Sequence, residues 1–263
     1  MEQNAFTKLR RFNLIMGGLH FIQGVLMIFL ATSVIQKIAE FQPVITINFL
    51  EFNFDTQSLE PASRALFTLP FGILVASFLL LSALAHALIS IPKKTNEIYV
   101  ADLKKGINRF RWFEYGLSSS VMIVLIATLF GIYDIASLSL IFILNFSMNM
   151  FGLLMEQVNA NKDDGKIKWG SFIWGSIAGV GPWVAILPYM FGTGNFDMVP
   201  WFVWAIVGTY FVAFNTFPVN MVLQYKKVGK WKDYLYGERV YIILSLVAKT
   251  FLAWLVLFGA MQP

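Results

Sequence analysis

One lysine of the chain, Lys249, stands inside a long apolar run, where its amine needs an explanation. It lies in the sequence Leu-Ser-Leu-Val-Ala-Lys-Thr-Phe-Leu-Ala-Trp at 244–254. An amine among apolar residues needs a carboxylate partner, or its nitrogen is used chemically. Glu114, in a second apolar run, can be that partner. The alternative is an ion pair that only fixes helix packing, but buried pairs are poor stabilisers and an apolar pair would usually serve as well.

A few polar residues near these two charges could take part in proton chemistry. The two histidines of the chain are His20 and His86. An imidazole titrates near neutral pH, so it could accept a proton released near Lys249 and Glu114. Ser118 and Ser119 follow Glu114 by one helical turn, and Ser245 precedes Lys249 by four residues, spacings that share a helix face. The alternatives are a hydrogen-bonded core histidine and serines that bond their own backbone.

Other kinds of site have no support in the sequence. The chain has no cysteine and only two histidines, so it offers no cluster with metal-ligand spacing, and it has no phosphate loop or nucleophile elbow. We therefore predict no metal site, no catalytic site and no enzyme. The basic loops are explained by membrane topology, which leaves little support for nucleic-acid binding.

The composition indicates a membrane protein. The 263 residues are 57% hydrophobic and 13% charged, whereas a soluble domain has about a quarter charged residues. This balance excludes a disordered chain, a disulfide scaffold and almost any soluble enzyme. We predict one domain over 1–263, a bundle of seven transmembrane helices. Each span needs roughly 20 apolar residues, and the seven predicted spans are 12–35, 65–91, 107–132, 135–155, 169–191, 198–225 and 240–261.

The basic residues predict the orientation of these spans. Of 20 Lys and Arg, 17 fall at the N-terminus and in the loops that share its side of the membrane. Only Lys37 and Arg64 fall on the other side, and Lys249 lies within a span. Because cytoplasmic loops are rich in Lys and Arg, we predict a multi-pass cell-membrane protein with its N-terminus in the cytoplasm and its C-terminus outside.

One predicted extracellular loop, 36–64, is long enough to need its own structure. Within it, Leu-Glu-Phe-Asn-Phe-Asp at 50–55 alternates apolar and polar residues, which is typical of a half-buried strand. We predict a short β-hairpin that lies over the outer mouth of the bundle or against a partner subunit. The alternative is an irregular loop.

The predicted spans place the candidate residues at similar depths. At 1.5 Å per residue, Lys249 lies about 18 Å from the inner end of its span and Glu114 about 15 Å. His20 and His86 fall in the same, cytoplasmic half of the membrane. Glu156 falls at the inner end of the fourth span, so we interpret it as interfacial, within reach of water or of the cluster around Lys162.

These features together resemble the heliorhodopsins, a family of retinal-binding membrane proteins. The resemblance covers essentially the whole chain and is most specific around Arg-Trp-Phe-Glu-Tyr at 111–115, the stretch 118–127 and the stretch 241–254. Further matches are 81–86, Gly-Lys-Trp at 229–231 and Gly-Glu-Arg at 237–239. Heliorhodopsins have an inverted orientation with the N-terminus inside, which the charge count indicates independently.

The resemblance implies roles for named residues. Lys249 would carry all-trans retinal as a Schiff base, Glu114 would be its counterion, and Ser118, Ser119 and Ser245 would join the hydrogen-bond network. His20 and His86 would line a polar cavity that accepts a proton. The other expected pocket residues are Asn145, which matches a polar family position, and Met148, Trp183 and Phe214, which would line an apolar ligand.

The resemblance also implies a slow photocycle, a homodimer and a light-sensing or regulatory role, with a cytoplasmic signalling partner to receive the signal. The outer halves of the predicted spans hold no ionisable residue as a second proton station, which favours a sensor over an ion pump. The alternative function is a light-gated proton channel or transporter. A third, a transporter with a static Lys249–Glu114 gate, is disfavoured because the chain shows no duplicated half.

Overall fold

The computed structural model describes residues 2–35, 41–160, 166–192, 194, 199 and 201–259. Lys37 and Lys162 lie outside the described residues, as do residues 198 and 261, which bound two predicted spans, and the first residues of the predicted loop 36–64.

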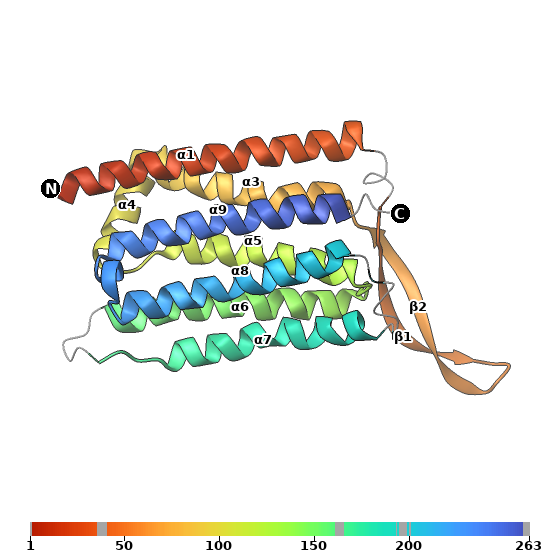
Figure 1. The fold of residues 1–263 in the computed structure, drawn as a ribbon. Helices are drawn as coiled ribbons and strands as arrows, with labels where there is room; N and C mark the ends of the chain where they lie inside the picture. The colour runs from red at the N-terminus through yellow and green to blue at the C-terminus, as the bar shows by residue number, and fades with distance from the viewer. Residues whose placement is uncertain are drawn as a thin grey trace.

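Seven described helices are long and apolar enough to span a bilayer, which confirms the predicted seven-helix architecture. They lie side by side as an elongated bundle (Figure 1). Their bounds are α1 (Glu2–Phe29), α3 (Phe71–Ser90), α5 (Arg109–Leu129), α6 (Ile135–Ala160), α7 (Gly170–Phe191), α8 (Trp201–Tyr225) and α9 (Tyr234–Gly259). The π-helix Leu30–Val34 extends α1 by one turn. Within a helix every backbone group finds its partner in the same segment, as a bilayer core requires.

A β-hairpin precedes α3, as predicted, so the alternative of an irregular loop is wrong. Strand β1 (Val44–Asn53) pairs antiparallel with β2 (Ser58–Thr68), and Val44 lies opposite Thr68. Phe54 and Asp55 were predicted to continue a strand but lie in the turn, because the Asn53 side chain accepts a hydrogen bond from the Asp55 backbone N–H at 2.9 Å. Such an Asx turn ends a strand.

The same hairpin corrects the start of the second span. That span was predicted to begin at residue 65, but Ala65 to Thr68 belong to β2 and α3 begins at Phe71. Apolar residues continue through the boundary, so hydropathy alone cannot locate it. Pro70 marks the change from strand to helix, since proline lacks an N–H and is tolerated at a helix start.

A further helix, α4 (Lys93–Lys104), was not predicted and covers the end of the bundle where α1 begins. Tyr99 and Leu103 of α4 are buried against Leu9 of α1 and Ile89 of α3. Because α4 is short and polar on one face, its sequence reads as a loop in a search for spans. The helix closes the bundle over the polar residues described below.

The helices pack in a ring in which one neighbouring pair, α7 and α8, makes few contacts. Close neighbours are α1 with α3, α3 with α5, α5 with α6, α6 with α7 and α8 with α9, and α9 also contacts α1 and α3. The largest apolar core lies towards the hairpin and includes Phe78, Ile123, Ile126, Leu252 and Val256.

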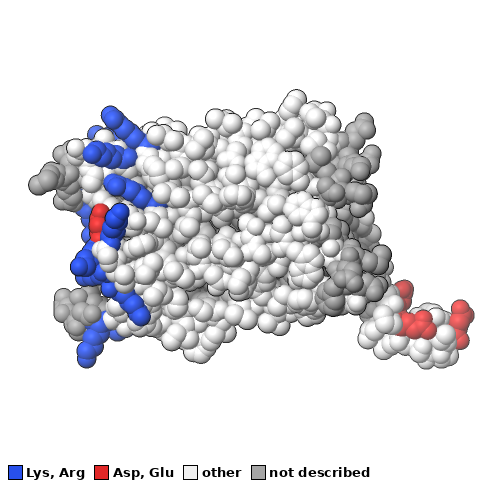
Figure 2. Space-filling model, viewed as in Figure 1, with Lys and Arg blue, Asp and Glu red and all other residues white. Residues whose placement is uncertain are grey.

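Charged side chains divide between the two ends of the molecule. Figure 2 shows Lys and Arg gathered at the end where α1 begins, which we call the basic end, with a small acidic patch among them, and further Asp and Glu on the projecting hairpin. The opposite end of the bundle, where the hairpin leaves it, we call the hairpin end (Figure 1). The separation agrees with the charge pattern of the sequence, while the direction of the bundle in the membrane stays a prediction.

The hairpin is attached to the bundle at Asp134, between α5 and α6. The backbone N–H of Thr46 in β1 donates to the Tyr133 carbonyl oxygen at 2.9 Å. The Asp134 carboxylate accepts from the backbone N–H and the hydroxyl of Ser137, both at 2.9 Å. These hydrogen bonds, first that of the Ser137 N–H, hold the pKa of Asp134 below its ordinary value.

We therefore expect Asp134→Ala to loosen this attachment. Loss of a helix-capping carboxylate costs about 1 kcal/mol, so amide hydrogen exchange should accelerate at Ser137 and in the first residues of β1. Because the Asp134 pKa is lowered, its contribution is complete above the ordinary Asp pKa and is lost as the pH falls through the lowered value. The control is Glu60→Gln near the hairpin turn, where Glu60 accepts from Asn53 and Thr56 instead. Unchanged exchange at Ser137 in Asp134→Ala would contradict this role.

Candidate functional site

Lys249 and Glu114 meet in the middle of the bundle as an ion pair. Lys249 projects from α9 and is 4% exposed, and the Glu114 side chain projects from α5 and is 9% exposed. Ser82 of α3 completes the group, because its hydroxyl accepts from the Lys249 amine at 2.5 Å and donates to the Glu114 carboxylate at 2.6 Å. Three helices thus supply one neutral, hydrogen-bonded unit.

Ser82 was not among the residues predicted for the site. Ser82 precedes His86 by one helical turn on α3, so a search for residues on the face of His86 would have found it.

The Lys249 side chain also borders an apolar cavity of about 140 Å³. Helices α5 to α9 line it, largely with aromatic and aliphatic side chains; among them are Trp112, Tyr115, Met122, Met148, Tyr210, Phe214, Phe217 and Leu252. Gly152 makes room for the Trp112 ring in this wall, because a Cβ there would collide with that ring. A buried primary amine at the wall of such a cavity is suited to covalent attachment of an elongated apolar carbonyl compound.

The structure divides the predicted pocket residues between this cavity and a layer behind it. Ser118, Ser119, Met148 and Phe214 line the cavity. Trp183 does not line it but packs behind, with its ring centroid 5.4 Å from that of Tyr210 and 6.2 Å from that of Phe214.

Ser119 and Asn145 bind each other instead of the ion pair. The Asn145 amide donates to the Ser119 hydroxyl at 2.7 Å and to the Ser120 hydroxyl at 3.0 Å. The Ser119 hydroxyl itself donates to the Tyr115 carbonyl oxygen at 2.5 Å. These contacts join α5 to α6 and fix the wall of the cavity next to Glu114.

The two histidines lie together, between α1 and α3. Their rings stack with centroids 5.8 Å apart, and His86 Nδ1 shares a hydrogen bond of 2.9 Å with Asn13 Oδ1. His20 is fully buried, and neither ring nitrogen has a hydrogen-bond partner within the described part of the chain. Gly17 permits this close approach, because a Cβ there would lie 2.7 Å from His86 Cβ.

A small polar cavity extends from Glu114 towards the basic end. It measures about 30 Å³, and His86, Ser245, Asn13, Tyr99 and Glu238 are among the residues that line it. A polar cavity of this size is large enough to hold water. Burial raises the pKa of the Tyr99 phenol in α4, so this group stays protonated and can donate. The cavity brings His86 and Ser245 to one surface with Glu114.

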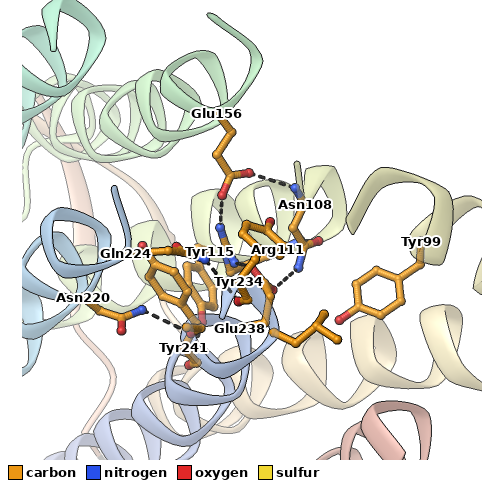
Figure 3. Close-up of polar contacts among 12 residues, drawn as sticks. Tyr99, Asn108, Arg111, Tyr115, Glu156, Asn220, Gln224, Tyr234, Glu238 and Tyr241 are labelled. Atoms are coloured by element: carbon orange, nitrogen blue, oxygen red, sulfur yellow. Dashed lines mark hydrogen bonds and ion pairs between the residues drawn. The ribbon is translucent and has the colours of Figure 1, made fainter. Parts of the chain in front are cut away.

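Beyond this cavity lies a buried charged cluster that the sequence analysis did not predict (Figure 3). Arg111 of α5 forms ion pairs with both Glu156 of α6 and Glu238 of α9. Asn108 supports both carboxylates, through its backbone N–H to Glu156 and its side-chain amide to Glu238, each at 2.8 Å. The Arg111 guanidinium also lies over the Tyr241 ring, 4.0 Å from its centroid.

This cluster corrects the interpretation of Glu156. The residue was predicted to be interfacial and within reach of water, but its side chain is 2% exposed. Arg111, Glu156 and Glu238 each lie within about two turns of a helix end, where long charged side chains usually reach water. Here they pair with one another and with Asn108 across α5, α6 and α9, so their burial depends on tertiary packing and not on the pattern within any one span.

The family model described as heliorhodopsin matches residues 9–261, nearly the whole chain. No curated protein matches the chain.

The Arg111 cluster yields a stability prediction. We expect Arg111→Gln to lower the free energy of unfolding of the detergent-solubilised apoprotein by about 3–5 kcal/mol, because two buried carboxylates lose their partner. Thermal unfolding should show this loss as a lower melting temperature. Lys93→Gln is the matched control, since the Lys93–Glu97 pair is exposed and 3.9 Å long and such pairs contribute little.

The triple variant Arg111→Gln, Glu156→Gln, Glu238→Gln removes the uncompensated charges and should recover much of the lost stability. If the triple variant is no more stable than Arg111→Gln, the electrostatic explanation is wrong.

Proposed function

Because the chain belongs to the heliorhodopsin family, whose members are retinal-binding, light-sensing membrane rhodopsins, we propose that it is a photoreceptor with retinal attached to Lys249 as a Schiff base. The observation that carries the proposal is the buried amine of Lys249, which pairs with Glu114 and borders an apolar cavity. The family is generally not enzymatic, which agrees with a sensory role.

Bound retinal, all-trans in the proposed resting state, supplies absorption of visible light and a light-driven change of shape. The residues of the chain supply the rest. Lys249 fixes one end of the chromophore, and Glu114 balances the positive charge held on that nitrogen. Ser82 orients both groups by accepting from one and donating to the other. Met148, Phe214, Ser118 and the aromatic wall hold the apolar remainder.

The residues near Glu114 support a short proton route towards the basic end. A movement that separates the Lys249 nitrogen from Glu114 leaves its proton without a compensating charge. His86, Ser245 and Glu114 all line the polar cavity. The His20 ring stacks on the His86 ring. We assign the two histidines as proton acceptors for this step.

The distribution of buried groups favours a sensor over a proton conductor. Within the described residues, the buried His, Arg, Asp and Glu side chains lie from the level of Lys249 towards the basic end, whereas apolar residues such as Ile126 and Val256 fill the half towards the hairpin. Conduction needs a polar route to both faces. The alternative, a light-gated proton channel or transporter, is decided by current recording under illumination.

The wider setting that we propose draws on the charge distribution for the orientation and on the family for the partners and the photocycle. We propose that 1–263 forms one domain in the cell membrane, with the basic end in the cytoplasm and the hairpin outside, since Lys and Arg gather at one end (Figure 2). The proposed partners are a second copy of the chain and a cytoplasmic protein that receives the signal, with a slow photocycle giving time for that contact.

The decisive experiment adds all-trans retinal to the apoprotein. We expect a visible absorption band in the intact protein and none in Lys249→Ala, because the attachment nitrogen is missing. The control is Lys226→Ala, which changes an exposed lysine after α8 and should leave the band in place. Absence of a visible band from the intact protein would end this proposal.

Glu114→Gln tests the counterion. Without the carboxylate charge, the visible band should shift strongly or be replaced by near-ultraviolet absorption as the linking nitrogen loses its proton. The comparison is Glu97→Gln, an exposed change on α4 that should leave the spectrum as it is. An unchanged spectrum and an unchanged pH titration in Glu114→Gln would remove Glu114 from this role.

A further inference from the structure

A groove on the outer surface of the bundle runs between α3 and α5, next to the ion pair. Its volume is about 560 Å³ and its lining is largely apolar. Leu84 and Leu88 of α3 and Phe113 and Leu117 of α5 form its sides, and all four are exposed. These positions repeat at helical spacing on each helix, so the groove follows the helix axes and faces the acyl chains of a bilayer.

The floor of this groove is also the wall of the polar cavity. Ala85, Phe110 and Glu114 border both the groove and the polar cavity. The counterion candidate is therefore separated from the bilayer by no further layer of protein on this side. Ala85 has the smallest side chain among the α3 residues that line the groove, since the others are Leu81, Leu84 and Leu88.

At the basic end of the groove, the guanidinium group of Arg109 can bind a phosphate. Arg109 borders the groove, and its side chain is 51% exposed. Its Nε and Nη2 donate to the two carboxylate oxygens of Asp102, at 2.7 and 3.0 Å. A guanidinium has five N–H donors, so the remaining donors can bind a phosphate oxygen, for which the planar guanidinium is well suited.

We propose that the groove between α3 and α5 binds one phospholipid, with its phosphate at Arg109 and one acyl chain over Ala85, Phe110 and Glu114. The acyl chain completes the wall of the polar cavity, keeps water from the bilayer side away from Glu114 and sets the polarity around the ion pair. The lipid binding stands on the groove itself, whereas the effect on the ion pair rests on the proposed retinal function.

The binding is tested on the apoprotein in detergent, with a phosphatidylglycerol that carries a diazirine in its acyl chain, added at a low lipid-to-detergent ratio. Peptide mapping after photolysis should place most of the label on α3 and α5 around Leu84, Leu88, Phe113 and Leu117. Unlabelled phosphatidylglycerol should compete, and diacylglycerol, which lacks the phosphate, should compete several-fold less well. Label spread evenly over all lipid-facing helices would overturn the proposal, and equal competition by diacylglycerol would overturn the place of the phosphate.

Two variants fill the groove. Ala85→Leu fills its floor, and Leu117→Trp fills it from the exposed edge, where no core packing is disturbed. Each should lose most of the α3 and α5 label, while the control Ala136→Leu, an exposed change at the hairpin end, should keep it. Full labelling of Leu117→Trp would overturn the proposal even if Ala85→Leu fails to fold.

The effect on the ion pair is read from the chromophore. In the retinal-loaded protein, the midpoint of the pH-dependent change in the visible band should differ between detergent and phosphatidylglycerol bilayers. In Leu117→Trp this difference should shrink several-fold. An equal difference in both proteins would overturn the coupling. Photolabelling needs no chromophore, so failure of lipid binding is distinguishable from failure of the retinal proposal.

Discussion

The burial of one ammonium group is the constraint on which the rest of the bundle depends. Lys249 lies too deep for its side chain to reach water, and an unpaired charge at that depth costs several kcal/mol or more. The structure meets this requirement with Glu114 from α5 and Ser82 from α3. The register of α3, α5 and α9 is thereby tied to one point, and the wall of the apolar cavity follows from it, because Tyr115 and Ser118 are carried on the same helix as Glu114.

A second charged group stands in the same low-dielectric interior, nearer the basic end. There one guanidinium serves two carboxylates, with Asn108 donating to each of them. The small polar cavity lies between the two groups and borders both Glu114 and Arg111. Charges in such surroundings interact over longer distances than in water. A change of charge at Lys249 therefore acts on this cluster, which holds the ends of α5, α6 and α9 together.

Much of the architecture was predictable because it follows from bilayer physics. The spans follow from the length of apolar runs, the hairpin follows from alternation at 50–55, and the level shared by Lys249 and Glu114 follows from helical rise. Tertiary packing explains what was missed. Glu156 was read as interfacial because its burial against Arg111 and Asn108, at the start of α5, leaves no mark in its own span. Residues 65–68 were read as helix because hydropathy does not distinguish a strand from a helix. Ser82 is one of several serines in the spans, and its place one helical turn before His86 is the one sequence signal noted for it, while its contact with Lys249 is visible only in the structure.

The same geometry explains why the bilayer has to be counted as part of the site. Asn13 of α1 and Ser245 of α9 also line the polar cavity, and on the side of the groove Ala85, Phe110 and Glu114 border both spaces. The polarity on the outer side of these three residues acts on the carboxylate as strongly as a protein side chain at the same distance would. In a membrane this outer side is hydrocarbon, whereas in detergent it depends on what fills the groove. The charge balance at Lys249 is thus a property of the protein and its lipid together.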